Sequence, residues 1–340
     1  MNGEDIMSNF DKWQVLKTFD SEIESLEFVS PVRGWMSDFI PKDKNDLPTS
    51  KLWAKYKQSI NRIQITEDGG KTWKTLYQES SGLIRHLQYM KETGWLLGIK
   101  VIACEGQEHP LHFMLYRSKN KGHHWEKVCD LPYSTKGFYF FDERQGYAWT
   151  LGQIFATSNA GNYWQPIASM DIVYKKGRTS NIGNNQFIYF IENEVVVKLN
   201  SWKDSRVVLP PPENFKPQDI LANPSQAIVY VIGLQNNKWC LLAYKNDKLI
   251  STEALPIQEK EFDVEVFAYG KDLLNLVGST ASSFLKPYYF YVRDKNGWHK
   301  ESLSGSKNFE HFAYWENHAW AVRIALLQGK RELLRRDMAG

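Results

Sequence analysis

Apolar and polar residues alternate along several short segments of the chain, and three of these segments begin with tryptophan. They cover residues 73–77, 125–128 and 164–167. Alternation with a period of two residues is typical of a β-strand that buries one face and exposes the other. We therefore predict a half-buried strand at each of the three positions.

The same frame precedes each of these strands: a hydroxyl residue, then Asp or Asn, then Gly, then Trp, at constant spacing. An Asp or Asn side chain can fold back onto backbone N–H groups, and Gly adopts a positive φ without a steric clash. The hydroxyl can add a weaker local hydrogen bond. The frame predicts a hairpin turn with these structural residues: Thr66, Asp68, Gly70, Trp73, Ser118, Asn120, Gly122, Trp125, Thr157, Asn159, Gly161 and Trp164.

This frame resembles the Asp-box, also called the bacterial neuraminidase repeat (BNR repeat). A strand that ends in a Gly–aromatic pair also precedes each box, with the pairs at residues 34–35, 94–95 and 146–147. The combination is similar to the β-propellers related to photosystem II stability and assembly factors. The resemblance implies a propeller of similar small sheets, in which the boxes are structural turns and not catalytic sites.

Further units follow the third box and begin near Phe187, Ala227, Val264 and Phe309. The last unit stops before the Trp that would open its fourth strand, whereas residues 13–19 read as such a strand without a box. We therefore predict an all-β, seven-bladed β-propeller in a single domain, residues 1–340. Six blades are the alternative, because residues 184–262 are poorly marked. Residues 12–19 would close the ring beside the strand that contains residues 331–334, and residues 1–11 would be flexible.

Composition narrows the choice of partners and compartment. Aromatic residues make up 14% of the 340 residues, and we expect most of them to fill the space between sheets. The net charge is +3 with both signs interspersed, so nucleic acid is not the predicted partner. No stretch has the roughly 20 apolar residues of a membrane span, and no basic and apolar leader begins the chain. We expect a cytoplasmic protein without membrane insertion; an exported mature form is the alternative, since the photosystem-factor relatives are often exported.

No catalytic, metal or cofactor signature stands out. Cys104, Cys129 and Cys240 have unrelated spacings and form no CxxC pair, which indicates reduced thiols. Sialidases share the Asp-box, but they need three arginines to clamp a carboxylate, and arginine is scarce between residues 118 and 292. We therefore predict no catalytic residue, no metal and no cofactor. A carbohydrate-active enzyme of sialidase-like type is the alternative, and two facing carboxylates at glycosidase separation would favour it.

The longest connections are expected on the face opposite the boxes. Residues 41–56 form the main insertion, and residues 104–110, 170–178, 210–215 and 282–287 add to it. Long loops often carry function, and aromatic anchors with charges of both signs suit a protein–protein interface. The candidate partner-binding residues are Lys51, Trp53, Lys55, Tyr56, Tyr174, Phe215 and Phe284.

The leading hypothesis is a non-enzymatic binding propeller with a protein partner. It would assist assembly of that partner, as the photosystem factors are thought to do, or neutralise it, as a bacterial immunity protein neutralises its toxin. Trp53 is the first expected anchor, because a segment rich in Lys, Asp and Pro has little other reason to hold a large ring. Fold alone does not choose between binding and enzymatic roles, since function resides in the site.

Overall fold

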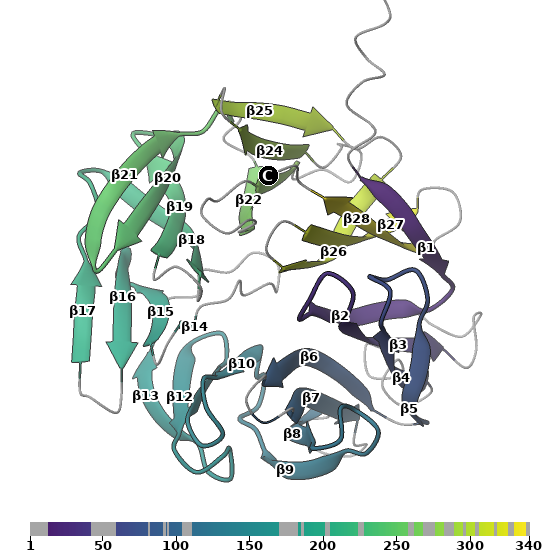
Figure 1. The fold of residues 1–340 in the computed structure, drawn as a ribbon. Helices are drawn as coiled ribbons and strands as arrows, with labels where there is room; N and C mark the ends of the chain where they lie inside the picture. Colours follow the sequence, from purple (N-terminus) through teal and green to yellow (C-terminus); the bar gives the residue numbers. More distant parts are fainter. Residues whose placement is uncertain are drawn as a thin grey trace, which may run out of the picture.

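The computed structural model is an all-β propeller, in which four-stranded sheets surround a common axis (Figure 1). It describes residues 13–41, 59–80, 82–90, 93, 95–103, 111–169, 183–184, 187–200, 205–223, 228–257, 262–267, 276–281, 289–294, 297–302, 306–315, 318–325 and 330–337. These residues form seven four-stranded sheets. The predicted flexibility of residues 1–11 concerns a segment outside the described residues.

The first three sheets contain the repeated turns. The first sheet consists of β2 (Glu22–Phe28), β3 (Gly34–Pro41), β4 (Ser59–Thr66) and β5 (Lys74–Glu79). The second consists of β6 (Leu83–Met90), β7 (Trp95–Ala103), β8 (Leu111–Ser118) and β9 (Glu126–Asp130). The third consists of β10 (Gly137–Phe140), β11 (Gly146–Trp149), β12 (Gln153–Thr157) and β13 (Gln165–Ser169).

The other four sheets follow the same order. The fourth consists of β14 (Gly183–Asn184), β15 (Phe187–Glu192), β16 (Val195–Asn200) and β17 (Ser205–Leu209). The fifth consists of β18 (Phe215–Asn223), β19 (Ile228–Gln235), β20 (Lys238–Lys245) and β21 (Lys248–Ala254). The sixth consists of β22 (Phe262–Phe267), β23 (Leu276–Ala281), β24 (Tyr289–Asp294) and β25 (Gly297–Ser302). The last consists of β26 (Ser306–Trp315), β27 (His318–Ala325), β28 (Arg331–Asp337) and β1 (Gln14–Phe19).

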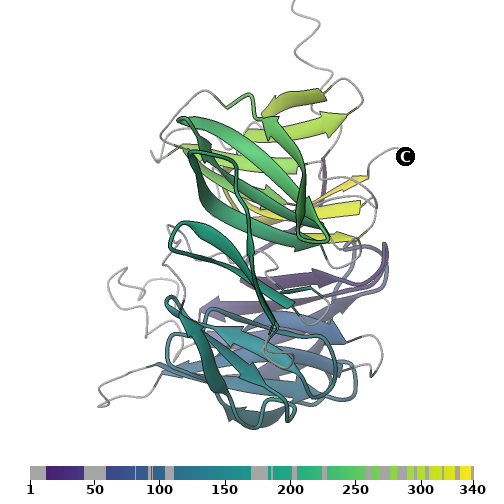
Figure 2. The same cartoon turned by 90° about the vertical axis from the view of Figure 1, so that its left-hand side faces the viewer.

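Connections alternate between the two sides of the ring. Strands β2, β6 and β26 lie toward the axis and β5, β9 and β21 lie at the rim (Figure 1), and the strands cross the ring from one side to the other (Figure 2). Neighbouring strands are antiparallel, so successive turns lie on opposite sides. The repeated turns join the third and fourth strands of their sheets, as predicted. Their side is termed the turn face, and the opposite side, which carries the connections from sheet to sheet, is termed the loop face.

The predicted pairing of the N-terminal strand is confirmed. β1 runs antiparallel to β28, with Phe19 opposite Arg331 and Val15 opposite Leu334. Phe19 is buried in one apolar cluster with Leu333 of β28. The N-terminal strand therefore covers an edge that β28 would otherwise expose.

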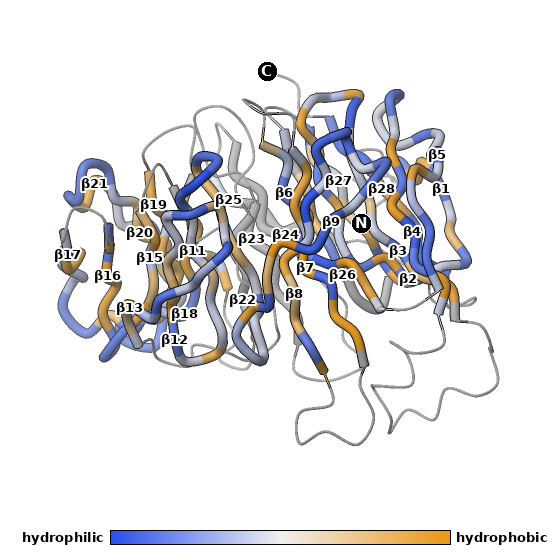
Figure 3. The backbone as a smooth tube through the Cα atoms, turned by 90° about the horizontal axis from the view of Figure 1, so that it is seen from below, coloured by the Kyte–Doolittle hydropathy of each residue, from blue (hydrophilic) through white to orange (hydrophobic). Residues whose placement is uncertain are grey.

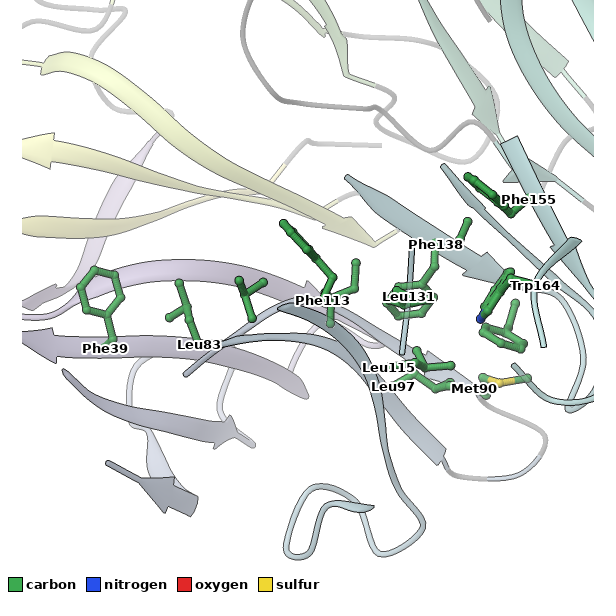
Figure 4. Close-up of a cluster of buried hydrophobic side chains, with 14 residues drawn as sticks. Phe39, Leu83, Met90, Leu97, Phe113, Leu115, Leu131, Phe138, Phe155 and Trp164 are labelled. Carbon is green, nitrogen blue, oxygen red and sulfur yellow. The ribbon is translucent and has the colours of Figure 1, made fainter. Parts of the chain in front are cut away.

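Apolar side chains fill the space between neighbouring sheets. Figure 3 shows apolar residues along the strands and hydrophilic residues in many of the turns. One cluster runs from Phe39 of the first sheet through Leu83 and Leu115 of the second to Phe155 and Trp164 of the third (Figure 4). Burial of apolar surface contributes roughly 25 cal/mol per Å². The sheets are therefore held to one another mainly by packing of their faces.

The three repeated turns share one hydrogen-bond pattern. The Gly70 N–H donates to Thr66 Oγ1 at 2.9 Å, and the Thr72 N–H donates to Asp68 Oδ1 at 2.9 Å. The equivalent acceptors are Ser118 and Asn120, at 2.8 Å each, and Thr157 and Asn159, at 3.0 Å each. Two short side chains thus satisfy the backbone of each turn.

Each turn presses a glycine against the preceding sheet. The glycines have positive φ, 103° at Gly70 and 86° at Gly161. A Cβ at Gly161 would lie 2.5 Å from Leu115 Cδ2, and one at Gly70 would lie 2.9 Å from Leu333 Cδ2. Both leucines belong to the preceding sheet. Glycine is therefore required for the backbone angle and for the close approach of the turn.

The tryptophan that ends each turn packs into the same seam. Trp125 and Trp164 are buried at 5% and 8% exposure. Trp73 and Trp125 donate their Nε1–H to the glycine carbonyls of their own turns, at 3.0 and 3.1 Å. Trp164 departs from this pattern and donates to Cys129 Sγ at 3.3 Å.

Two turns are also held by a tryptophan from the preceding sheet. Trp35 of β3 donates its Nε1–H to the Lys121 carbonyl at 3.1 Å, and Trp320 of β27 donates to the Gly69 carbonyl at 2.9 Å. Both rings are completely buried. Lys121 and Gly69 occupy the same position in their turns, so one interaction repeats at two seams.

The Gly–aromatic pair of the second sheet differs in register from those of the first and third. In the first and third sheets the glycine of the pair lies opposite the first residue of the turn, but in the second sheet Leu96 lies opposite Ser118. Trp95 is therefore not equivalent to Trp35. Its ring instead lies beneath the Arg117 guanidinium, 4.5 Å from the ring centroid.

Removal of residues 1–20 should unfold or aggregate the protein, because β28 would lose its outer neighbour and the core would lose Phe19. Thermal melting by circular dichroism and size-exclusion chromatography would measure this. Removal of residues 1–11 alone is the control and should leave the melting curve in place. Unchanged melting of the longer deletion would refute the closure.

Asp68→Ala should lower the free energy of unfolding at pH 7 by about 1–2 kcal/mol, through loss of the turn hydrogen bonds. Asp68→Asn is the matched control and should keep most of the stability, because Asn serves in the other two turns. Chemical denaturation would measure both. Equal stability of the alanine variant and the wild type would contradict a structural role.

The Asp68 contribution should also depend on pH. Burial alone would raise the pKa of Asp68, but hydrogen bonds from Thr72 and Thr66 and the Lys71 N–H outweigh it and lower the pKa from 3.8 to about 2. A depressed pKa in the folded state adds stability above pH 3.8, which is lost as the pH falls toward 2. The free energy of unfolding of the wild type, relative to that of Asp68→Asn, should therefore decrease as the pH falls from 3.8 to about 2.

Candidate binding site at the propeller axis and loop face

Bulges interrupt the pairing of four strands that begin their sheets. They occur in β2 between Ile23 and Ser25, in β6 between Arg85 and Gln88, and also in β18 and β26. A bulge leaves backbone groups without their ladder partners, and bulges are common beside functional sites. Side chains of neighbouring sheets take over several of these groups.

Hydrogen bonds connect the bulged strands of neighbouring sheets. His311 of β26 places Nε2 2.8 Å from the Ile23 carbonyl of β2. Ser25 of β2 accepts a hydrogen bond at its Oγ from the Leu87 N–H of β6, at 2.9 Å. The last, first and second sheets are thus joined at the axis by bonds between side chains and backbone.

Gln88 and Glu27 extend these links. The Gln88 side chain of β6 bonds both backbone groups of Phe140 in β10, donating to the carbonyl at 2.5 Å and accepting from the N–H at 2.8 Å. Glu27 of β2 accepts the Tyr89 N–H of β6 at 2.9 Å. Gln88 therefore ties the third sheet to the second, and Glu27 adds a second tie between the first and second.

The Glu27 carboxyl group is enclosed in the seam between the first two sheets. Its Oε2 is buried and has no hydrogen-bond partner among the described residues. Burial raises the pKa of Glu27 from 4.5 to about 8, although the Tyr89 N–H opposes this shift. The carboxyl is therefore mostly protonated at neutral pH, and burial of a charge is avoided.

Four basic side chains form an axial basic cluster: Arg85, His86, Lys136 and His311. Burial, and then the nearby charges of Arg85, His311 and Lys136, lower the pKa of His86 to about 3, so its imidazole is neutral at pH 7. Burial and Arg85 also lower the pKa of Lys136. All four residues nevertheless keep part of their surface exposed. The side chains of the cluster are therefore partly buried, and solvent still reaches part of each one.

An aromatic side chain is exposed in the loop-face connection that also carries Lys136. Tyr133 lies in the connection from β9 to β10 and is 51% exposed. Its ring meets the Phe113 ring edge-on, with the centroids 6.0 Å apart. Lys136 ends the same connection, so an exposed aromatic ring and a cluster member share one short segment.

The structure describes one of the predicted partner-binding residues, Phe215, and corrects it. Its ring is 6% exposed and packs in a cluster with Leu209 of the fourth sheet and Ile220 of the fifth. The prediction of an exposed anchor is wrong here, because Phe215 begins β18 and completes the seam between these sheets. The other predicted residues lie outside the described part of the chain: Lys51, Trp53, Lys55, Tyr56, Tyr174 and Phe284.

Sequence reasoning missed the axial residues. Ser25, Glu27 and Gln88 resemble the polar positions of ordinary half-exposed strands, and only the bulges turn them toward a neighbouring sheet. A usable signal was the adjacent basic pair Arg85 and His86 inside a strand with five apolar or aromatic residues among eight. In the ranges described here, no three His, Cys, Asp or Glu residues gather as metal ligands would, and no helix is long and apolar enough to cross a membrane.

Comparisons with known proteins relate the chain to other structures by fold. No protein-family model and no curated protein matches the sequence. Similar solved structures include YCF48 bound to D1 peptide (TM-score 0.55, 14% identity, covering 96% of this chain and 95% of that one). They also include YCF48 from Cyanidioschyzon merolae (TM-score 0.56, 13% identity, 96% and 99%) and a structure of the COPII outer coat vertex on membranes (TM-score 0.57, 9% identity, 95% and 86%). At these identities the likeness establishes the propeller fold alone.

Glu27→Gln should stabilise the protein increasingly as the pH rises. The pKa of Glu27 is about 8 in the folded state and 4.5 in the unfolded state, so the stability of the wild type falls as the pH rises from 4.5 to 8. Glutamine does not titrate and has no such dependence. Chemical denaturation at pH 5 and pH 8.5 would measure the difference, with Glu67→Gln on the exposed turn as control. The same stability difference at both pH values would contradict a buried, protonated Glu27.

Proposed function

We propose that this protein is a non-enzymatic propeller that binds a protein partner through its loop face. The observation that carries the proposal is Tyr133, whose ring is half exposed on that face. Tyrosine is enriched among the residues that dominate binding energy, because it offers a large contact area with little conformational entropy to lose. Its neighbour Lys136 adds positive charge, which would orient an approaching partner.

The segment around Tyr133 is held in a defined conformation. The Leu131 N–H donates to the Phe113 carbonyl at 2.8 Å, and Thr135 donates to the Pro132 carbonyl through its N–H at 3.2 Å and its Oγ1 at 2.5 Å. Ser134 between them has a φ of 66°. A side chain presented by a fixed backbone loses less freedom on binding, so its contacts count more toward affinity.

Fold comparison supports a binding role, because one similar structure is YCF48 with a bound D1 peptide. We propose the same general use of the fold here, of assembly-factor type, with neutralisation of a partner as in immunity proteins as the other form. Taking each four-stranded sheet as one blade gives a seven-bladed ring. The repeated turns, which we interpret as Asp-boxes, would serve the fold and leave the loop face for the partner.

Tyr133→Ala should weaken partner binding by about 2 kcal/mol, as loss of a central aromatic anchor does. The partner would first be identified by affinity purification from the native host with mass spectrometry, and binding then measured by calorimetry with purified components. Tyr163→Ala is the matched control, because Tyr163 is 65% exposed on the turn face. The proposal fails if both variants bind like the wild type, or if only Tyr163→Ala loses affinity.

A further inference from the structure

We propose that Arg85, His86 and Lys136 form an oxyanion site at the propeller axis, which takes a small dianion such as a dicarboxylate or a phosphate. The site draws on two sheets, since Arg85 and His86 lie on β6 and Lys136 directly precedes β10. The inference goes beyond the proposed function, because it requires no protein partner.

The described residues do not neutralise the positive charges of this site. The side chains of Arg85, His86 and Lys136 make no hydrogen bond or ion pair with the described residues. Among the described groups, those that act electrostatically on His86 are Arg85, His311 and Lys136, all of them basic. Like charges held close together disfavour the folded state. An arrangement that costs stability and is kept in the fold indicates a ligand that supplies the missing negative charge.

Three partly buried cations elsewhere in the described chain have acidic partners. Lys100 lies 2.5 Å from Glu79, and Lys198 lies 2.8 Å from Asp247. Arg62 forms a two-pronged pair with Asp38, with Nε 3.0 Å from Oδ1. The axial cluster differs from these three sites, because no described acidic side chain pairs with it.

The backbone at His86 supports the same conclusion. His86 has a φ of 55°, inside the bulge between Arg85 and Gln88. A non-glycine residue in this conformation is strained, and strained residues concentrate at functional sites. The next two residues are held by neighbouring sheets. The Leu87 N–H donates to Ser25 Oγ, and the Gln88 side chain donates to the Phe140 carbonyl. The neighbouring sheets therefore hold His86 where the bulge places it.

The chemistry of the three side chains fits a dianion. Arg85 and Lys136 supply two positive charges, and Arg presents a planar fork of N–H donors that matches carboxylate or phosphate oxygens. A neutral imidazole can donate one further hydrogen bond without adding charge. Two positive charges and one neutral donor balance an anion of charge −2.

Calorimetric titration with succinate and with inorganic phosphate, at constant ionic strength, would test the site. We expect saturable binding to the wild type, about tenfold or more weaker in Arg85→Gln and in Lys136→Gln, because each variant removes a charge-assisted hydrogen bond. Lys71→Gln is the control, since it removes one positive charge from the exposed turn face and should bind like the wild type. Tighter binding of succinate would identify a carboxylate ligand, and tighter binding of phosphate a phosphate ligand.

Two results would overturn the proposal. One is the absence of saturable binding of either anion up to about 20 mM; the other is equal affinity in the wild type and both axial variants. Melting temperatures without ligand give an independent test, because Arg85→Gln relieves repulsion and should melt higher than the wild type. A lower melting temperature of this variant, with circular dichroism showing it folded, would make Arg85 a structural residue and would also overturn the site.

Discussion

The repeated turn wedged between two sheets is the contact on which the rest of the propeller depends. Each turn is built by its own sheet, through hydroxyl and Asp or Asn side chains, yet its glycine rests against leucines of the preceding sheet. At two seams a buried tryptophan of that preceding sheet also donates a hydrogen bond to the turn. A local sequence motif therefore fixes a contact between neighbouring sheets, because the same few residues form the turn and pack against the preceding sheet.

The polar side chains of the repeated turns are engaged in hydrogen bonds within those turns. Positions that look available for ligands, such as Asp68, already accept hydrogen bonds from their own turn. A ligand at such a position would have to replace bonds whose loss leaves backbone groups unsatisfied. The described part of the loop face has no equivalent repeated device, and it includes Tyr133. The axis is a third region, where bulges bring polar side chains of neighbouring sheets into contact.

The sequence predicted the elements that depend on local chemistry. Turn positions, the strands after them and the pairing of β1 with β28 follow from residue types at fixed spacing, and the structure has them. The different register of Trp95 and Trp35 could not be read from the sequence, because register depends on the neighbouring strand and not on the Gly–aromatic pair alone. Phe215 was misplaced for a similar reason: a loop boundary shifted by one residue moves a ring from the surface into a seam.

The axial groups were beyond sequence reasoning for a different physical reason. Whether burial of Glu27 or Arg85 lowers the stability of the fold depends on the groups across the seam, and those groups belong to another sheet. Protonation relieves the cost at Glu27, because a carboxyl group becomes neutral when it takes up a proton. An arginine has no such route, since its guanidinium stays charged in proteins. Arg85 therefore retains a charge that the described protein leaves unmatched. The packed seams of the first three sheets supply stability that offsets the repulsion at this charge. An external anion that binds Arg85 would explain why the charge is present.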